Sequence, residues 1–421
     1  MQHKVLVDYE LAVAQQGFVV RAMLTLEGKA PTRDNRIPLN LSVVLDRSGS
    51  MAGDKLAAAR DAAAMLIRRL HPDDVVSVVA YDDQVLTVAE PATGAAQQNL
   101  PNVVRAIEAG GSTNLSGGWF RGHELVARSK REGGVNRVIL MTDGLANVGI
   151  KDPAQLLGLC RTACGVGITT TTMGFGADYD EKLLRGMADA GGANTWYIER
   201  PDQAADVFAE ELEGLLSLSA QNVSVEIRPA AQVRLTAVRH EYPTTKVPDG
   251  LRLELGDLYA REPKSVLVEL FVPGLESPSD VRLADIVVNA HVLTDGGGVD
   301  RQEVRFPISS PLTSAGHAEP EVRHEILLLD AARAREEALR KRDEGDLGGA
   351  AAVLRAMTLA FREAPGGMTP ELEKQAADLV AMADRFAAGS VDGADAKYLA
   401  QQAYNSYRRK MAYAERLRRK S

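Results

Sequence analysis

The chain has 421 residues, of which 45% are hydrophobic and 25% charged, and its formal net charge is −8. This composition is typical of a soluble globular protein, and the length predicts two or three domains. The negative charge argues against nucleic-acid binding by the surface as a whole. No apolar run is long enough to span a membrane, and residues 1–17 lack the apolar core of a secretory signal, so we expect no membrane span and a cytoplasmic protein.

Residues 18–26, FVVRAMLTL, place alternate apolar side chains on one face, which predicts a half-buried strand. Between residues 38 and 219, short apolar or β-branched segments alternate with helical segments. The predicted strands are residues 41–46, 75–81, 137–143, 168–176 and 194–198. Because these apolar runs are nearly continuous, we predict an α/β domain with a doubly wound, mostly parallel sheet that helices cover on both faces.

Residues 221–310 contain strands of period two with Pro, Gly and Asp turns between them, which predicts an antiparallel β-sandwich. The strand at 18–26 is expected to join this sandwich, because no strand of its own kind lies near it in the sequence. Residues 320–421 are alanine-rich and charged, and they contain four candidate helices. The predicted domains are residues 1–37 (first part of the sandwich), 38–219 (the inserted α/β domain), 220–315 (the rest of the sandwich) and 316–421 (an α-helical domain).

Oxygen-bearing side chains follow several of the predicted strands. Asp46 ends a strand in NLSVVLDRSGSMAGDK, and Ser48 and Ser50 follow it at alternate positions. A strand-to-helix turn with a capping serine would explain this stretch by itself. However, Thr113 lies in the glycine-rich stretch EAGGSTNLSGG, and Asp143 lies where another strand stops, in LMTDGLANVG. Because ligands of open α/β sheets bind outside the carboxyl ends of the strands, we predict that these three loops meet there.

Together these loops would offer two carboxylates and three hydroxyls, and a set of oxygen ligands alone favours a hard cation. The expected ion is Mg²⁺, with Mn²⁺ or Ca²⁺ as alternatives, because ligation that is rich in hydroxyls and poor in carboxylates favours the smaller ions. Neutral hydroxyl ligands leave the ion electron-poor, so that it can accept an Asp or Glu carboxylate from a protein partner. The pattern therefore predicts a metal-dependent binding site and not a reaction centre.

The segments DRSGS, GGSTN and TDG resemble the motifs of the von Willebrand factor A fold and its metal-ion-dependent adhesion site. The resemblance extends over residues 38–219. It implies that Ser48, Ser50 and Thr113 are hydroxyl ligands and that Asp46 and Asp143 are the acidic ones. The flanking sandwich resembles proteins of the inter-alpha-trypsin-inhibitor and chloride-channel-regulator type. Those proteins are extracellular in animals, whereas cytosolic bacterial relatives also exist, and the missing signal favours a bacterial relative.

Other charged residues near these motifs have alternative interpretations. Arg47 stands where the family often has a small or apolar residue, and its charge would either weaken cation binding or guide an acidic partner. Asp54, Asp82 and Asp83 lie in loops near the same edge and could hold a second ion. Solvated loop carboxylates are the interpretation that we favour for these three residues.

Catalytic motifs are absent from the sequence. Cys160 and Cys164 share a face of a predicted helix and could form a redox pair or half of a metal site, but buried structural thiols are favoured. No HExxH or GxxxxGK[ST] motif occurs, and His123 lies near no plausible nucleophile, so we expect no enzyme. The basic segment 407–420 could contact an acidic partner, nucleic acid or an anionic lipid surface, although a solvated helix end is favoured.

Three functional hypotheses remain. The leading one is a binding module that captures an acidic residue of a protein partner through the cation. The second is an accessory subunit of a chaperone-like ATPase, an analogy at the level of the fold. The third is a metal-dependent hydrolase, which is disfavoured because the sequence offers no general base besides the aspartates of the site.

Overall fold

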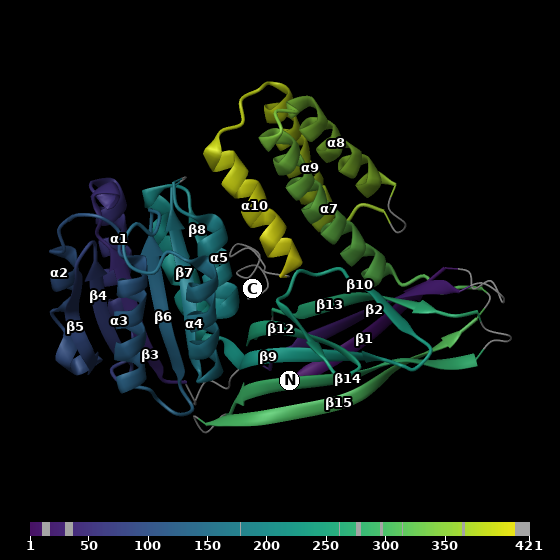
Figure 1. The fold of residues 1–421 in the computed structure, drawn as a ribbon, viewed down its shortest axis with the longest axis horizontal. Helices are drawn as coiled ribbons and strands as arrows, with labels where there is room; N and C mark the ends of the chain where they lie inside the picture. The colour runs from purple at the N-terminus through teal and green to yellow at the C-terminus, as the bar shows by residue number, and fades with distance from the viewer. Residues whose placement is uncertain are drawn as a thin grey trace.

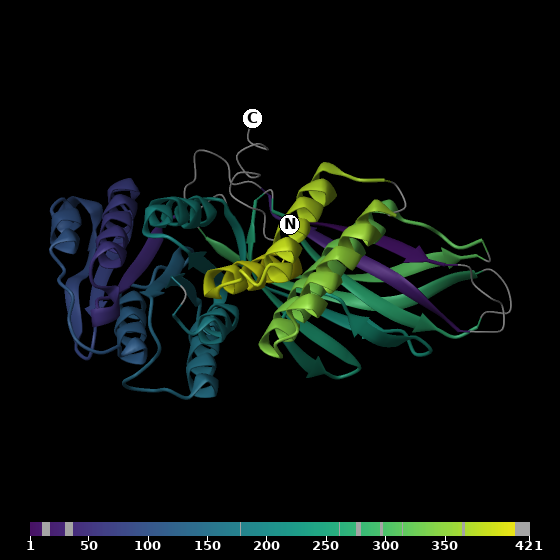
Figure 2. The same ribbon diagram turned by 90° about the horizontal axis from the view of Figure 1, so that it is seen from above.

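The computed structural model describes residues 1–10, 17–29, 37–176, 178–260, 262–274, 279–294, 298–313, 315–363 and 367–408. In these ranges the strands form three sheets, and helices cover the largest sheet or form a separate group (Figures 1 and 2). The basic segment 407–420, for which a solvated helix end was favoured, falls almost wholly outside the described residues, since residues 409–421 are not among them. None of the described helices combines the length and the hydropathy needed to cross a membrane.

The largest sheet has six strands in the order β5-β4-β3-β6-β7-β8. The strands are β3 (Leu39–Asp46), β4 (Val75–Tyr81), β5 (Val85–Thr93), β6 (Val135–Thr142), β7 (Ile168–Phe175) and β8 (Gly192–Ile198). All neighbours are parallel except β4 and β5, which are antiparallel. The prediction of a mostly parallel α/β sheet is confirmed. The edge strand β5 was not predicted, because its side chains are only half-buried and it contains Pro91.

Helices cover both faces of this sheet, and we call the sheet with its helices the α/β domain (Figure 1). The helices are α1 (Asp54–Arg69), α2 (Leu100–Arg105), α3 (Leu115–Arg128), α4 (Pro153–Gly165), α5 (Glu181–Ala190) and α6 (Ala204–Leu216). Leu41 and Val43 of β3 belong to the apolar core that contains residues of α1, α2 and α6. Val44, on the opposite face of the same strand, belongs to the core formed with α3, α4 and α5. The alternation along β3 therefore divides the core into two layers.

The two smaller sheets have the strand orders β1-β2-β13-β10 and β11-β12-β9-β14-β15, and all of their neighbouring strands are antiparallel. The bounds are β1 (Gln2–Tyr9), β2 (Phe18–Glu27), β9 (Leu218–Pro229), β10 (Arg234–Val238), β11 (Thr244–Val247), β12 (Gly250–Tyr259), β13 (Lys264–Val272), β14 (Ser279–Leu293) and β15 (Val299–Leu312). Apolar side chains from both sheets share one core. We call these two sheets the sandwich sheets.

The chain leaves and re-enters the sandwich sheets at neighbouring points. β2 pairs with β13, although the whole α/β domain separates them in the sequence. Gly28, just after β2, lies against Ser219 of β9, because a Cβ at Gly28 would be only 2.6 Å from the Ser219 Cβ. The Ala260 N–H also donates to the Ser217 carbonyl over 2.8 Å. The segment that leads from β2 into the α/β domain and the segment that returns from it to β9 therefore lie side by side.

A buried ionic network joins the α/β domain to the sandwich sheets. The guanidinium of Arg137, on β6, is fully buried and donates to Glu211 of α6 over 3.0 Å and to Asp257 of β12. Its Nε donates to the Thr169 Oγ1 over 2.9 Å. The second oxygen of Glu211 accepts from the Trp196 Nε1 over 2.9 Å. One arginine therefore compensates two buried carboxylates that belong to different parts of the chain.

The last described elements are the helices α7 (Pro320–Asp343), α8 (Leu347–Arg362), α9 (Pro370–Ala387) and α10 (Gly393–Tyr407). α7 packs on a sandwich sheet, where Val322 and Leu329 meet Met23 and Leu267. α10 lies beside α7 and reaches the α/β domain (Figures 1 and 2). There the Tyr404 hydroxyl donates to Asp189 over 2.7 Å. The helical part therefore contacts both other parts of the molecule.

Candidate metal-ion site

Asp46 is the last residue of β3, and its side chain is fully buried. Its carboxylate accepts from neutral donors, namely the Ser48 N–H over 2.8 Å and the Thr142 hydroxyl over 2.5 Å. Burial raises the pKa of Asp46 and the negative charge of Asp143 adds to this effect, although the hydrogen bonds oppose it. A nearby cation would therefore stabilise the ionised form of Asp46.

Ser48 precedes the short turn η1 (Gly49–Met51) between β3 and α1, and Ser50 lies within it. Their hydroxyl oxygens are 3.2 Å apart, and the Ser50 hydroxyl donates to the Asp143 Oδ1 over 2.7 Å. Asp143 follows β6 directly, and its side chain is fully buried. The first and third predicted loops therefore meet at the carboxyl edge of the sheet.

Thr113 lies just before α3 and is almost fully buried. Its carbonyl accepts from the N–H groups of Asn147 and Val148 over 3.0 Å each, which ties this loop to the one that follows Asp143. A Cβ at Gly144 would lie 3.2 Å from the Thr113 Oγ1 and 3.6 Å from the Ser50 Oγ. The structure thus brings all five predicted residues to one edge of the sheet, while their role as metal ligands stays a prediction.

Asp82 has a different role from the one that the sequence suggested. The expectation of a solvated loop carboxylate is wrong, because Asp82 is buried and accepts from the N–H groups of Gly111 over 2.9 Å and Gln84 over 2.8 Å. Burial alone would raise the pKa of Asp82, but these hydrogen bonds and Arg47 lower it. Arg47 forms an ion pair with Asp82 at 2.9 Å. Asp82 therefore braces the loop that carries Thr113, and the charge of Arg47 is compensated.

Sequence reasoning missed Lys55, the second residue of α1. Its Nζ lies 2.6 Å from the Asp143 Oδ2, and its side chain is 30% exposed. The only signal in the sequence was a lysine in the first turn of a helix, where a positive charge is unfavourable beside the helix dipole. A buried carboxylate from a distant loop compensates this charge.

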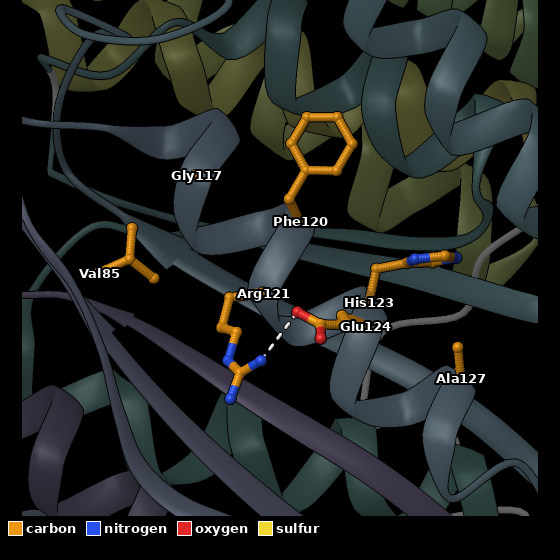
Figure 3. Close-up of a pocket in the computed structure, with 7 residues that line it drawn as sticks. All are labelled: Val85, Gly117, Phe120, Arg121, His123, Glu124 and Ala127. Carbon is orange, nitrogen blue, oxygen red and sulfur yellow. Dashed lines mark hydrogen bonds and ion pairs between the residues drawn. The ribbon is translucent and has the colours of Figure 1, made fainter.

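Outside this edge, the surface of α3 is hollowed. A depression of about 620 Å³ lies beside α3 and is lined by Val85, Phe120, Arg121 and Glu124, among others (Figure 3). Arg121 and Glu124 pair with each other at 2.8 Å. Burial lowers the pKa of His123, whose ring stacks on Trp119. These contacts are those of a helix surface.

The two cysteines are free thiols. Cys160 is buried in the core, and burial raises the pKa of both thiols to about 12, so both stay protonated at neutral pH. The Cys164 thiol donates to Asn222 over 2.9 Å and lines a cavity of about 560 Å³ between the α/β domain and the sandwich sheets. These contacts favour structural thiols over a reactive pair.

The family model of the von Willebrand factor type A domain matches residues 40–210. The uncharacterized protein sll0103 of Synechocystis sp. is 30% identical over 60% of this chain and 61% of its own length. The uncharacterized protein YfbK of Escherichia coli is 28% identical over 65% and 48% of the two chains. Human inter-alpha-trypsin inhibitor heavy chain H3 is 29% identical over 51% of this chain but only 23% of its own. The chain thus spans less than two thirds of each of these relatives.

Solved structures show the same fold over nearly the whole chain. The von Willebrand factor type A protein from Catenulispora acidiphila has a TM-score of 0.73 and 20% identity, with 97% of each chain covered. The ArnB paralog VWA2 from Sulfolobus acidocaldarius has a TM-score of 0.58 and 15% identity, with 96% of this chain and 97% of that chain covered. The match to the von Willebrand factor type A domain therefore lies within the α/β domain, and we call this part of the chain the VWA domain.

Proposed function

We propose that the VWA domain is a metal-dependent protein-binding module, in which Asp46, Ser48, Ser50, Thr113 and Asp143 hold a divalent cation. When bound, the cation would supply positive charge to which an Asp or Glu carboxylate of a partner can add. The observation that carries the proposal is the convergence of two buried carboxylates and three hydroxyls at the carboxyl edge of the sheet. VWA domains are in general protein-interaction modules, which agrees with this function.

The donor set suits a small hard cation. Adjacent oxygens of an octahedral Mg²⁺ site are about 2.9 Å apart when the ion–oxygen distances are about 2.0–2.1 Å. The Ser48 and Ser50 hydroxyls are 3.2 Å apart, and the Ser50 hydroxyl is 2.7 Å from Asp143. These spacings need only small adjustments to surround Mg²⁺, while Mn²⁺ and Ca²⁺ remain alternatives.

The surface beside these residues suits a protein partner. Leu145, two residues after Asp143, has a side chain that is 53% exposed. A large apolar side chain at the rim would gain little from a small hydrophilic ligand, but it would be buried by a protein surface. We therefore expect the partner's carboxylate to be accompanied by apolar contacts around Leu145.

We expect the wild-type chain to bind one Mg²⁺, and we expect Asp46→Asn and Thr113→Val each to weaken this binding at least about tenfold, because the first removes a carboxylate charge and the second removes a hydroxyl ligand. Isothermal titration calorimetry measures the affinity. Asp61→Asn is the matched control, since that carboxylate is exposed on α1 and pairs with Arg105. A pull-down from lysate of the native host, with Mg²⁺ and with EDTA, should retain a protein only with Mg²⁺. Equal Mg²⁺ affinity in all four proteins, or none in the wild type, would refute the metal site.

The sequence is the basis for proposing two further features of the protein. They are the domain limits 1–37, 38–219, 220–315 and 316–421, and a cytoplasmic location. An accessory role beside a chaperone-like ATPase stays a hypothesis that co-purification would test. Metal-dependent hydrolysis stays the least favoured hypothesis, and turnover of phosphoesters or peptides that Asp143→Ala abolishes would revive it.

A further inference from the structure

Lys55 is held in place by the candidate metal site. Its ammonium lies 2.6 Å from the Asp143 Oδ2, while the Ser50 hydroxyl donates to the other oxygen of the same carboxylate over 2.7 Å. Asp143 is fully buried, so its negative charge requires compensation. Lys55 supplies that compensation from the first turn of α1, at the helix end where a cation is disfavoured.

The lysine side chain is packed and does not extend freely into solvent. Gly176 follows β7 with a φ of +66°, and a Cβ at this position would lie 3.6 Å from the Lys55 Cε and 3.7 Å from its Nζ. These are ordinary van der Waals distances, so the end of the lysine runs along the backbone at Gly176. Its side chain is only 30% exposed. The ammonium is therefore fixed beside Asp143 by contacts on two sides.

We propose that Lys55 is an internal counter-ion that makes cation binding and the capture of a partner carboxylate depend on each other. The inference rests on the proposed function. With both aspartates ionised, Asp46, Asp143 and Lys55 give the site one net negative charge. A divalent cation changes this to one net positive charge, which a single carboxylate from the partner neutralises. Without Lys55 the cation alone would neutralise the site, and the partner's carboxylate would add an uncompensated charge.

Lys55 should therefore weaken binding of the cation alone and strengthen binding of a carboxylate to the loaded site. We expect Lys55→Gln to bind Mg²⁺ about tenfold more tightly than the wild type, because a fixed positive charge next to the ligands is removed. Lys55→Arg keeps the charge and should bind Mg²⁺ much as the wild type does. Lys246→Gln, at an exposed position on β11, removes the same charge far along the chain and should leave the affinity unchanged.

Whether a carboxylate strengthens Mg²⁺ binding is measured by repeating the Mg²⁺ titrations with acetate in place of chloride at equal ionic strength. Acetate should tighten Mg²⁺ binding to the wild type and have a smaller effect on Lys55→Gln. If the wild type binds no cation, the proposed function itself is wrong. If the wild type binds Mg²⁺ and Lys55→Gln binds it with the same affinity and the same acetate effect, only the inference about Lys55 is overturned.

Urea unfolding gives a second readout that does not depend on a partner. In EDTA, Lys55→Gln should unfold at a lower urea concentration than Lys55→Arg, because Asp143 is then buried without a counter-charge. Adding Mg²⁺ should remove most of this difference, since the cation takes over the compensation. Folding of Lys55→Gln only in the presence of Mg²⁺ would support the inference in its strongest form. Failure to fold with Mg²⁺ as well would overturn it, because the role of Lys55 would then be structural.

Discussion

Arg137→Met is expected to lower the free energy of unfolding by about 3–5 kcal/mol, because it removes the counter-charge of buried Glu211 and the larger counter-charge of buried Asp257. In the native protein, burial would raise the pKa of Glu211, but Arg137 and the hydrogen bonds around it lower it. Burial raises the pKa of Asp257, and Arg137 opposes that rise. Without the arginine, both carboxyl groups would lose the interaction that keeps them ionised.

Urea unfolding at pH 7 measures this loss, and its dependence on pH tests the cause. In the variant the folded-state pKa of each carboxyl lies above its unfolded value, so stability is lost as pH rises through these values. The difference in the free energy of unfolding between the wild type and the variant should therefore shrink when the measurement is repeated at pH 5. Arg128→Met is the matched control, because Arg128 is half exposed and pairs with Glu90 on the surface. A deficit below about 1 kcal/mol, or one that grows at pH 5, would contradict the assigned role of Arg137.

Gly122→Val is expected to destabilise the protein by about 2–3 kcal/mol, through overpacking between α3 and β3. A Cβ at Gly122 would lie only 2.4 Å from the Cγ2 of Val44 and 3.2 Å from the Oγ of Ser42. Val44 is fully buried in a central strand and cannot move aside easily. Because Thr113 lies just before α3, displacement of this helix should also weaken Mg²⁺ binding.

The control for this substitution is another helical glycine, Gly158 of α4, where an added Cβ would meet nothing within 4 Å. Gly158→Ala should raise the free energy of unfolding by about 0.5–1 kcal/mol through helix propensity. Thermal or urea unfolding of both variants measures the two effects. The close packing of α3 on the sheet would be refuted if Gly122→Val were as stable as the wild type.

Much of the α/β fold could be predicted from the sequence because its central strands are buried on both faces and read as continuous apolar runs. The edge strands β1 and β5 were missed for the opposite reason. β1 becomes buried only at its end, at Asp8 and Tyr9, and no residue of β5 is fully buried. Strands of this kind are stabilised by pairing with a neighbouring strand, and the hydrophobic pattern of their own sequence gives little indication of that pairing.

The predicted site residues lie directly at strand ends, or in a glycine-rich loop ahead of a helix, which is why their convergence could be foreseen. Lys55 and Asp82 could not be foreseen, because their roles depend on contacts between distant segments. Lys55 meets Asp143 across 88 positions, and Asp82 meets the Gly111 N–H across 29. The glycines of GGSTN held an indirect signal, since a Cβ at Gly110 would overlap the Asp82 carboxylate.

The side-by-side crossings at Gly28 and Ser219 have a mechanical consequence. A pull on a partner held at the far edge of the VWA domain would reach the rest of the chain through two strands at once. One of these strands, β2, is central in the four-stranded sheet, and the other, β9, is central in the five-stranded sheet. Each is hydrogen-bonded on both sides, so detachment requires shearing four ladders together. The VWA domain is therefore attached to the rest of the chain through two strands. Such an attachment resists both twisting and extraction better than a single flexible linker would.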